Sequence, residues 1–330
     1  MKSNDIVKAL SPVAVFCYNR PWHIEQTLEA LSNNELASDS VIYIFCDGPK
    51  EDATAEQIKQ IEDVRRVVRK KQWGGEVHIV ESEKNKGLRD SIIGGASTVI
   101  EKYGKVIVLE DDLVTSPYFL KYMNEALDFY ESYRSVFSIS AQSNVDPDFF
   151  PEDYPYDVYA CQTHMPWGWA TWKDRWNLID WDIDKELAKR FEKEEYMRNA
   201  FMRGGEDLFY RSLPERLAGK KVWSICFSLA HFKYHSVSIT PVIPYIHNNG
   251  FDGTGDNCGG SNLLSHNFYV NAKRDVRFLD VVYMDSRIIN RFYSGSILHR
   301  RPFFKRIKNR LVYLFFKKKD TVLKGKVYYK

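Results

Sequence analysis

Three consecutive acids end a short apolar run in the first half of this chain. The run Val-Ile-Val-Leu at residues 106–109 is followed at once by Glu110, Asp111 and Asp112. The run predicts a buried strand of a parallel sheet, and open α/β sheets bind ligands at the carboxyl ends of such strands. Carboxylates packed this closely repel one another. A divalent cation would relieve the repulsion and also hold a diphosphate. The alternative is a solvated acidic turn, in which Asp111 and Asp112 cap a helix that begins near Ser116.

Two more polar segments follow predicted strands. The apolar runs at residues 13–17 and 41–46 are followed by Tyr-Asn-Arg at residues 18–20 and by Asp47. Because the carboxyl ends of parallel strands meet at one edge of a sheet, we expect these segments to lie beside the acids. An aromatic ring and an arginine suit a base and a phosphate, and the carboxylate of Asp47 suits the imide N–H of a uracil. The Asp-Gly-Pro sequence is also an ordinary turn signal.

The first 140 residues alternate between strand and helix patterns. Pro21 opens the first helix, since proline suits a first helical turn, and Ile24, Leu28 and Leu31 form the inner face of this helix. The alternation predicts an α/β fold with a doubly wound, mostly parallel sheet. The other predicted helices lie at residues 54–72, 87–103 and 118–133, and the other predicted strands at residues 77–80 and 136–140.

The pattern changes after residue 141. Residues 142–182 are rich in Pro, Asp and Trp, and they predict loops around a short strand near Val158. We expect this second half to pack onto the sheet, because no low-complexity linker separates the two halves. The segments predicted there are helices at residues 184–201 and 205–219, an element at 222–232 and a Gly/Asn-rich loop at 248–262.

Composition predicts a large globular protein of the cytoplasm. The chain has 330 residues, of which 44% are hydrophobic and 15% aromatic, enough for a large core. No run of eighteen apolar residues predicts a membrane span, and the polar first ten residues do not resemble a signal peptide. The five cysteines lack the spacing of a disulfide framework, which fits a reducing compartment. Cys17 and Cys46 fall in predicted strands as small apolar fillers.

Charge is distributed unevenly along the chain. Residues 300–330 contain twelve Lys or Arg and one acid, a balance of +11, so the net charge of +3 leaves −8 on residues 1–299. Residues 302–319 place bulky apolar side chains at helical spacing among lysines and arginines, the pattern of an in-plane membrane anchor that binds an anionic surface. The alternative is a docked helix with solvated lysines. No nucleic-acid module accompanies the charge, so we expect no nucleic-acid partner.

These segments together resemble GT-A nucleotide-sugar glycosyltransferases. The patterns are similar to those of bacterial polysaccharide glycosyltransferases and of the Golgi N-acetylglucosaminyltransferase I family. The resemblance extends over roughly residues 10–260. It rests on residues 13–21 (Val-Ala-Val-Phe-Cys-Tyr-Asn-Arg-Pro), 45–48, 85–88, 108–113, 166–172 and 249–255.

The resemblance implies a fold and a division of the chain. A Rossmann-like nucleotide-sugar-binding half at residues 1–141 is expected to be fused to an α+β acceptor and catalytic half at 142–270. Residues 271–330 are expected to form a C-terminal extension with the basic amphipathic helix.

The resemblance also implies roles for the polar segments. Asp112 would bind Mn²⁺ or Mg²⁺, which bridges the donor diphosphate, and Glu110 and Asp111 would contact ribose or the donor sugar. Asp47 would face uracil. The nucleotide pocket would be lined by Tyr18, Asn19, Arg20, Asn85, Gly87 and Leu88.

The second metal ligand is left open by the sequence. Many relatives have a histidine shortly after the glycines of the 249–255 segment, but Asp256, Asn257 and Cys258 stand there in this chain. His247 is a candidate substitute, although a lone histidine beside a loop is more often structural.

A catalytic base and an acceptor surface are expected in the second half. An inverting transfer needs a carboxylate, and the candidates are Glu206 and Asp207, with Asp174 and Asp182 in reserve. The alternative is that Glu206 and Asp207 only favour the positive end of a helix. Five tryptophans fall within residues 167–181. We expect most of them in the core, with Trp167 or Trp169 near the acceptor sugar.

We therefore expect a metal-dependent, inverting glycosyltransferase that uses a UDP-sugar. Its expected acceptor is a glycan, such as a lipid-linked O-antigen or capsule precursor, in a bacterium. The enzyme would be cytoplasmic and peripheral at the inner face of the cell membrane. One alternative is a sugar-phosphate nucleotidyltransferase, whose usual glycine-rich first loop is absent after residues 13–17. The other is a non-catalytic carbohydrate-binding protein.

Overall fold

The computed structural model describes residues 9–182, 185–205, 208, 222–253 and 271–295. Several predicted features lie outside the described residues: the basic helix at 302–319, the candidate bases Glu206 and Asp207, most of the predicted helix at 205–219, and the loop from residue 254 onward. Within the described residues, no helix is long and apolar enough to cross a bilayer.

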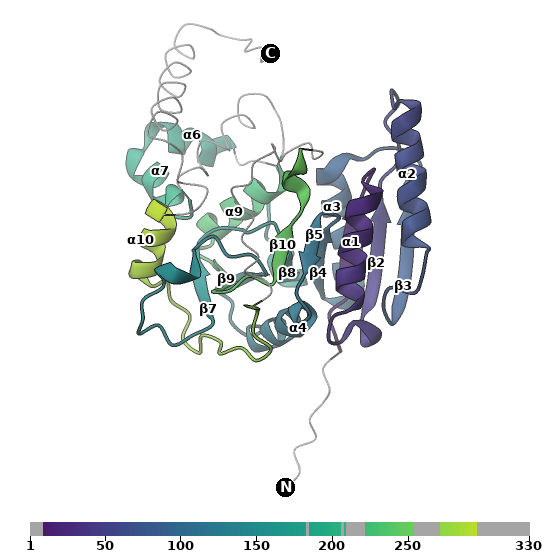
Figure 1. The fold of residues 1–330 in the computed structure, drawn as a ribbon. Helices are drawn as coiled ribbons and strands as arrows, with labels where there is room; N and C mark the ends of the chain where they lie inside the picture. Colours follow the sequence, from purple (N-terminus) through teal and green to yellow (C-terminus); the bar gives the residue numbers. More distant parts are fainter. Residues whose placement is uncertain (1–8, 183–184, 206–207, 209–221, 254–270, 296–330) are drawn as a thin grey trace, which may run out of the picture.

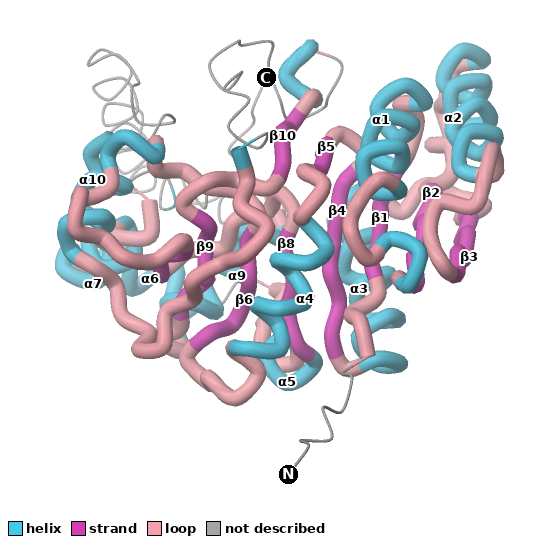
Figure 2. Tube along the Cα trace, turned by 60° about the horizontal axis from the view of Figure 1, so that its bottom comes forward, coloured by secondary structure: helices cyan, strands magenta, loops and turns pink. Residues whose placement is uncertain are grey.

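A single eight-stranded sheet runs through both halves of the described chain (Figure 2). The pairs β3–β2, β2–β1, β1–β4 and β6–β9 are parallel, and only β8 and β7 run in the opposite direction. The predicted mostly parallel sheet is thus confirmed. In spatial order the strands are β3 (Glu76–Glu81), β2 (Val41–Cys46), β1 (Val13–Cys17), β4 (Lys105–Glu110), β8 (Trp169–Trp172), β6 (Val136–Ser140), β9 (Val237–Pro241) and β7 (Val158–Cys161).

Helices cover both faces of this sheet (Figure 1). One face is covered by α1 (Pro21–Ser32), α2 (Ala55–Val68) and α4 (Phe119–Phe129), and the other by α3 (Gly87–Tyr103), α5 (Lys173–Trp176) and α9 (Trp223–Lys233). The strand β1 shows why. Val13 and Val15 pack on the first face, whereas Ala14 and Phe16 pack on the second, because successive side chains of a strand point to opposite sides. The doubly wound arrangement is thus confirmed.

The remaining described elements are short. A two-stranded antiparallel ribbon, β5 (Leu113–Thr115) and β10 (Ile246–Asn248), stands beside the end of β4. The others are η1 (Ala37–Asp39), η2 (Pro147–Phe149), α6 (Lys185–Lys193), α7 (Glu195–Met202), η3 (Gly250–Asp252) and α10 (Ser286–Gly295).

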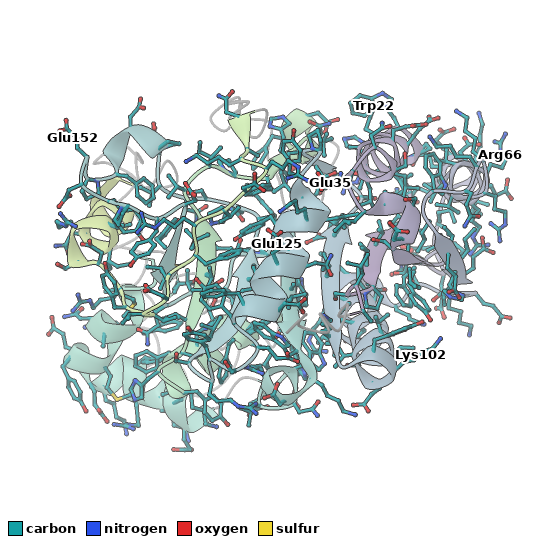
Figure 3. The ribbon with its side chains drawn as sticks, turned by 90° about the horizontal axis from the view of Figure 1, so that it is seen from below. Trp22, Glu35, Arg66, Lys102, Glu125 and Glu152 are labelled. Atoms are coloured by element: carbon teal, nitrogen blue, oxygen red, sulfur yellow. The ribbon has the colours of Figure 1, made fainter. Side chains whose placement is uncertain are left out.

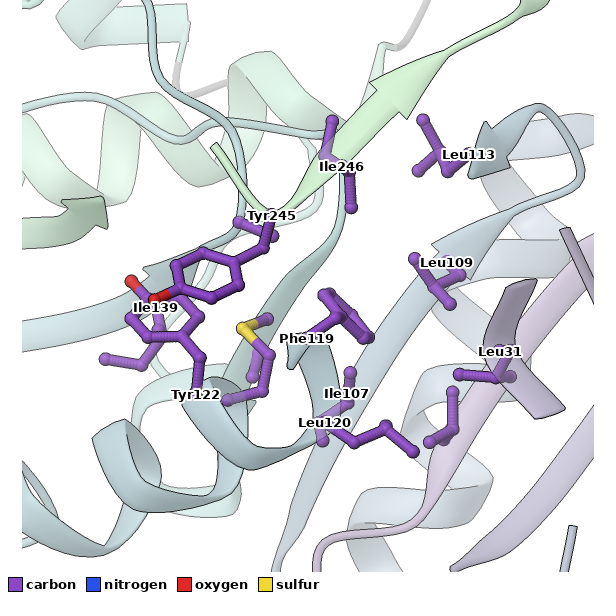
Figure 4. Close-up of a cluster of buried hydrophobic side chains, with 14 of the residues drawn as sticks. Leu31, Ile107, Leu109, Leu113, Phe119, Leu120, Tyr122, Ile139, Tyr245 and Ile246 are labelled. Atoms are coloured by element: carbon purple, nitrogen blue, oxygen red, sulfur yellow. The ribbon is translucent and has the colours of Figure 1, made fainter. Parts of the chain in front are cut away.

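The core beside the ribbon joins the two halves (Figure 4). Tyr122 of α4 and Tyr245 stack with their ring centroids 4.3 Å apart. The Tyr122 hydroxyl donates to the Ser140 carbonyl at 2.9 Å, so this fully buried ring keeps its hydrogen bond. Ile107 and Leu109 of β4 belong to the same cluster. The end of β4 is therefore held between elements that lie far apart in the sequence.

Local signals fix the ends of the helices that carry the predicted site. Thr54 and Gln57 form a capping box at the start of α2. Gly104 adopts φ +77° after α3, the left-handed conformation that commonly ends a helix, and β4 begins at the next residue.

On the outer surface Trp22 of α1 is 56% exposed (Figure 3).

Two strands of the second half differ from the sequence-based prediction. Residues 169–172 were expected within loops, but they form β8, which enters between β4 and β6 antiparallel to both. The strand β9 was not predicted. The helix predicted at 184–201 is divided, since α6 ends at Lys193 and α7 begins at Glu195. The run Trp-Ala-Thr-Trp is short and lies just after Gly168, so its sequence alone does not predict a strand. It forms a strand because it pairs with two neighbouring strands.

Candidate functional site

The predicted polar segments meet at one edge of the sheet. In the parallel register Cys17 pairs with Cys46, Cys46 with Glu81, and Phe16 with Glu110. The residues after β1, β2, β3 and β4 therefore share the carboxyl edge, as the sequence predicted. Cys17 and Cys46 are buried there as free thiols.

Arg20 joins the acids at the centre of this edge. Its Nη2 atom donates to Asp112 Oδ2 at 2.9 Å and also to Asp111 Oδ1, and its Nε lies 3.4 Å from Asp111 Oδ2. Asp111 and Asp112 are buried, and the cap residue of α4 is Tyr118, which makes no side-chain capping bond. The alternative of a solvated turn that caps a helix is therefore wrong.

The three carboxyl groups of Glu110, Asp111 and Asp112 outnumber the guanidinium of Arg20 beside them. Burial, with the charges of Asp112 and Asp111, raises the pKa of Glu110 to about 8. Burial also raises the pKa of Asp111 to about 6, against the opposing effect of Arg20. Such shifts mean that the protein environment stabilises the charged carboxylates too little. The edge therefore favours an additional positive charge.

Gly250 forms a cradle for the carboxylate of Asp112. The ribbon β5–β10 brings Asn249 next to the acids, and its backbone N–H donates to the Asp112 carbonyl at 2.9 Å. A Cβ atom on Gly250 would lie 2.2 Å from Asp112 Oδ2 and 3.0 Å from Asn248 Oδ1. Only glycine leaves room for the carboxylate. The side-chain oxygens of Asp112 and Asn248 face the same small space.

Asn248 is a site residue that the sequence analysis missed. Its oxygen accepts from the Gly250 N–H at 2.7 Å, and the side chain is buried. His247 is the preceding residue of the same strand, and successive side chains of a strand point to opposite faces. This alternation argues against His247 as the ligand beside Asp112. Burial lowers the pKa of His247.

The residues present fit a hard dication held jointly with a substrate. Among the described residues no group of three or more His, Cys, Asp or Glu side chains could enclose a metal ion. Asp112 and Asn248 instead offer a pair of oxygens beside Glu110 and Asp111, two carboxyl groups whose raised pKa values a nearby cation would lower. Mg²⁺ is often bound in this way, through one or two carboxylates completed by substrate phosphates and water.

Asp47 anchors the loop that leads into α3. Its carboxylate accepts from the backbone N–H groups of Gly48, Lys86 and Gly87, each at 2.9 Å, and from Asn85 Nδ2 at 3.0 Å. Gly87 adopts φ +77°, which favours glycine at this position. Asp47 thus positions Asn85, Gly87 and the positive end of α3 at the site edge. Its contact with a uracil stays a prediction.

The other predicted nucleotide-pocket residues lie around this centre. Asn19 Nδ2 donates to Gln60 Oε1 of α2 at 3.3 Å. The hydroxyl of Tyr18 is buried and has no hydrogen-bond partner among the described residues. Leu88 is 43% exposed in the first turn of α3. Tyr18 and Asn19 come from the loop after β1, and Leu88 comes from α3.

The turn η3 is held from two sides. The ring of Trp167 meets that of Phe251 edge to face, with centroids 5.5 Å apart. On the other side His23 Nε2 of α1 lies 3.2 Å from Asp252 Oδ2. Gly250 therefore sits in a turn that is braced by both halves of the described chain, and Trp167 lies next to the cradle.

Of the two acceptor candidates, Trp169 belongs to the core. It is fully buried in β8, and its ring stacks on Trp176 with centroids 5.7 Å apart. A ring enclosed on both faces cannot stack on a sugar, so the structure corrects this alternative. Trp167 remains partly exposed and keeps its candidate role. Trp172 and Trp176 are core residues, as expected.

The two reserve candidates for the catalytic base, Asp174 and Asp182, lie in different parts of the structure. Trp172 pairs with Lys105, the first residue of β4, so Asp174 lies at the opposite edge of the sheet from the acids. Asp174 also forms ion pairs with Arg134 and Arg175, and the structure thus excludes it as the base. Asp182 is exposed and follows Trp181, whose carbonyl accepts from Arg89 of α3 at 2.8 Å.

This combination of fold and site defines a class of enzyme. The arrangement is the GT-A fold of glycosyltransferases. It combines parallel strands that are followed by polar loops, an acid triplet at the end of the central strand and an antiparallel ribbon beside that strand. The pattern of Glycosyl transferase family 2 matches residues 13–177, half of the chain, which includes the acid triplet. The chain belongs to Glycosyl transferase family 2 and is a glycosyltransferase.

Several solved structures share parts of the fold at low similarity. TarS of S. aureus is 15% identical, with a TM-score of 0.27 over 40% of this chain and 21% of TarS. UDP-glucose pyrophosphorylase complexed with UDP-glucose is 12% identical, with a TM-score of 0.35 over 70% and 90% of the two chains. Mouse xyloside xylosyltransferase 1 is 8% identical, with a TM-score of 0.33 over 68% and 82%. The match with this chain thus covers about a fifth of the length of TarS. No curated protein matches its sequence.

Proposed function

We propose that this glycosyltransferase transfers a sugar from a UDP-sugar in a metal-dependent, inverting reaction. The observation that carries the proposal is the position of Asp112. Its carboxylate lies at the end of β4, in the cradle of Gly250, beside the oxygen of Asn248. Family membership disfavours the alternatives of a nucleotidyltransferase and a non-catalytic binding protein.

Different residues at this edge of the sheet are proposed to bind different parts of the donor. Asp112, with Asn248 beside it, would hold Mn²⁺ or Mg²⁺, which neutralises charge on the leaving diphosphate when bound. Arg20 carries the guanidinium best placed to pair with phosphate oxygens. Asp47 keeps the start of α3 in position, where the N-terminal N–H groups favour an anion. Tyr18 and Leu88 are proposed to border the nucleotide.

The chemical step requires a base on the acceptor side. An acceptor hydroxyl attacks the anomeric carbon, its proton passes to a carboxylate, and the bond from that carbon to the diphosphate breaks. Glu206 and Asp207 are the proposed candidates for this carboxylate, although both lie outside the described residues. Trp167, next to the cradle, is proposed to present its ring to the acceptor sugar.

A donor screen tests the proposed reaction. The protein is incubated with UDP-, GDP- and CMP-sugars, with Mn²⁺ or with EDTA, and release of the nucleoside diphosphate or monophosphate is measured. We expect hydrolysis of a UDP-sugar that requires the metal, because water can replace the acceptor slowly. Equal turnover in EDTA, or turnover of only a CMP-sugar, would contradict the proposal. NMR of the first product from a defined acceptor reports inversion or retention.

We further propose that the acceptor is a lipid-linked precursor of a bacterial surface polysaccharide. The support is the charge of residues 300–330, which carry twelve Lys or Arg and one acid. Such a segment binds an anionic membrane surface, which would hold the enzyme at the inner face of the cell membrane. We expect the full chain to pellet with vesicles that contain anionic lipid, and less so as salt rises. Equal pelleting of a chain without residues 300–330 would exclude this role.

A further inference from the structure

Arg20 has a fixed backbone and a side chain that can turn. Its carbonyl accepts from the Ile24 N–H at 3.1 Å as the first hydrogen bond of α1, and Pro21 follows it directly. The guanidinium is connected through a long, flexible stem, and its side chain is 18% exposed. The guanidinium can therefore move by rotation about side-chain bonds, without any change in the helix.

The guanidinium occupies the carboxylate oxygens that a dication would need. Nη2 is bonded to one oxygen each of Asp111 and Asp112, and the oxygen of Asp112 involved is Oδ2, the same atom that faces the Gly250 cradle. Two positive charges cannot share this oxygen at contact distance without strong repulsion. A dication that binds to Oδ2 of Asp112 must therefore displace Arg20.

A nucleoside diphosphate offers Arg20 a better partner. Guanidinium and phosphate oxygens form paired, charge-assisted hydrogen bonds. When a diphosphate enters together with a dication, Arg20 exchanges the carboxylates for phosphate oxygens, and the dication takes its place as the positive charge beside the acids. A dication alone would instead leave the guanidinium without its acceptors.

We propose that Arg20 is an internal counter-ion that covers Asp111 and Asp112 in the donor-free enzyme and transfers to the donor diphosphate, so that metal and donor each bind more tightly in the presence of the other. This inference rests on the proposed function, because it assumes that Asp112 is a metal ligand. In this arrangement Arg20 is a positioning residue that couples two ligands, and the coupling must be reciprocal.

The size of the coupling depends on the fraction of donor-free molecules in which Arg20 is paired with Asp111 and Asp112. If the covered state is about 90% populated without donor, the apparent affinity for the metal falls about tenfold, because only the uncovered fraction can bind. Removing the guanidinium removes this penalty. Metal binding without nucleotide should then become tighter by about the same factor.

The test measures Mn²⁺ binding by isothermal titration calorimetry, with and without UDP. The proteins are the full chain, Arg20→Met, Arg20→Gln and the matched control Arg175→Met. Arg175 is also a buried arginine paired with an aspartate, Asp174, but it lies at the opposite edge of the sheet. The glutamine variant keeps a polar side chain in case the methionine variant does not fold.

For the unaltered chain we expect weak Mn²⁺ binding alone and tight binding with UDP. Arg20→Met and Arg20→Gln should bind Mn²⁺ alone about tenfold more tightly, with less gain from UDP. Mn²⁺ should also raise their melting temperature more than that of the unaltered chain or of Arg175→Met.

Two outcomes would overturn the inference, and they can be distinguished. If the unaltered chain binds Mn²⁺ tightly with UDP but the Arg20 variants bind Mn²⁺ alone no better than it does, the counter-ion role fails and the proposed function stands. If the unaltered chain binds no Mn²⁺ even with UDP, both the inference and the metal-dependent function fail.

Discussion

Asp112→Asn is expected to lower kcat/KM for sugar transfer by about a thousandfold or more. Asparagine has nearly the same shape but no charge, so the carboxylate that faces the Gly250 cradle loses its attraction for a dication. A metal at a leaving group stabilises the transition state by several kcal/mol, and about 4 kcal/mol corresponds to a factor of about a thousand. The measurement is steady-state UDP release with saturating Mn²⁺.

The matched control for this variant is Asp128→Asn. Asp128 lies on α4, where it forms an ion pair with Lys105, the first residue of β4, away from the site edge. This variant should keep the activity of the unaltered chain. If Asp112→Asn kept more than about a tenth of kcat/KM, with circular dichroism showing an intact fold, Asp112 would not be a metal ligand.

Gly250→Ala is expected to abolish tight UDP–Mn²⁺ binding and most of the activity. The new methyl group would lie 2.2 Å from Asp112 Oδ2, so either the carboxylate or the turn η3 must move. The turn is braced by Trp167 and His23, which restricts its movement. Overpacking of this kind costs about 1–3 kcal/mol of stability. A displacement of about 1 Å in a site also costs about a hundredfold in rate.

The control for this prediction is Gly94→Ala on α3. Gly94 is exposed, and a Cβ atom there would have nothing within 4 Å. Alanine is a better helix former than glycine, so this variant should be neutral or more stable by up to about 1 kcal/mol. Urea unfolding and UDP–Mn²⁺ calorimetry are measured for both variants. Unchanged affinity and stability in Gly250→Ala would show that the cradle is not as tight as described.

The first half of the fold could be predicted from the sequence because its signals are local. Strands at residues 13–17, 41–46 and 136–140 alternate with amphipathic helices, and a parallel sheet follows from that order. Once the sheet is parallel, the meeting of Asp47 with the acid triplet at one edge follows from geometry. The helix ends were also signalled locally, by Thr54 with Gln57 and by Gly104.

The remaining parts of the fold and the site could not be predicted, because they depend on pairings between segments that lie far apart in the sequence. Asn248 reaches Asp112 only because β10 pairs with β5, and nothing in the short run at residues 246–248 specifies that partner. The ion pair of Arg20 with the acids could not be predicted for a related reason, because Arg20 and Asp112 lie about ninety residues apart in the sequence and are brought together only by the pairing of β1 with β4. Trp167 and Trp169 looked equivalent until the position of β8 in the sheet buried only one of them.

The position of β8 also has a consequence for how the polypeptide emerges from the ribosome. The strands β4 and β6 are complete well before residues 169–172 have been synthesised, yet β8 is the strand that lies between them. Until it arrives, the facing backbone edges of β4 and β6 have no strand partner, close to the acids that follow β4. Unpaired edges of this kind invite association with other chains. Completion of the acidic site edge thus waits for a late strand, and the transferase cannot become competent one half at a time.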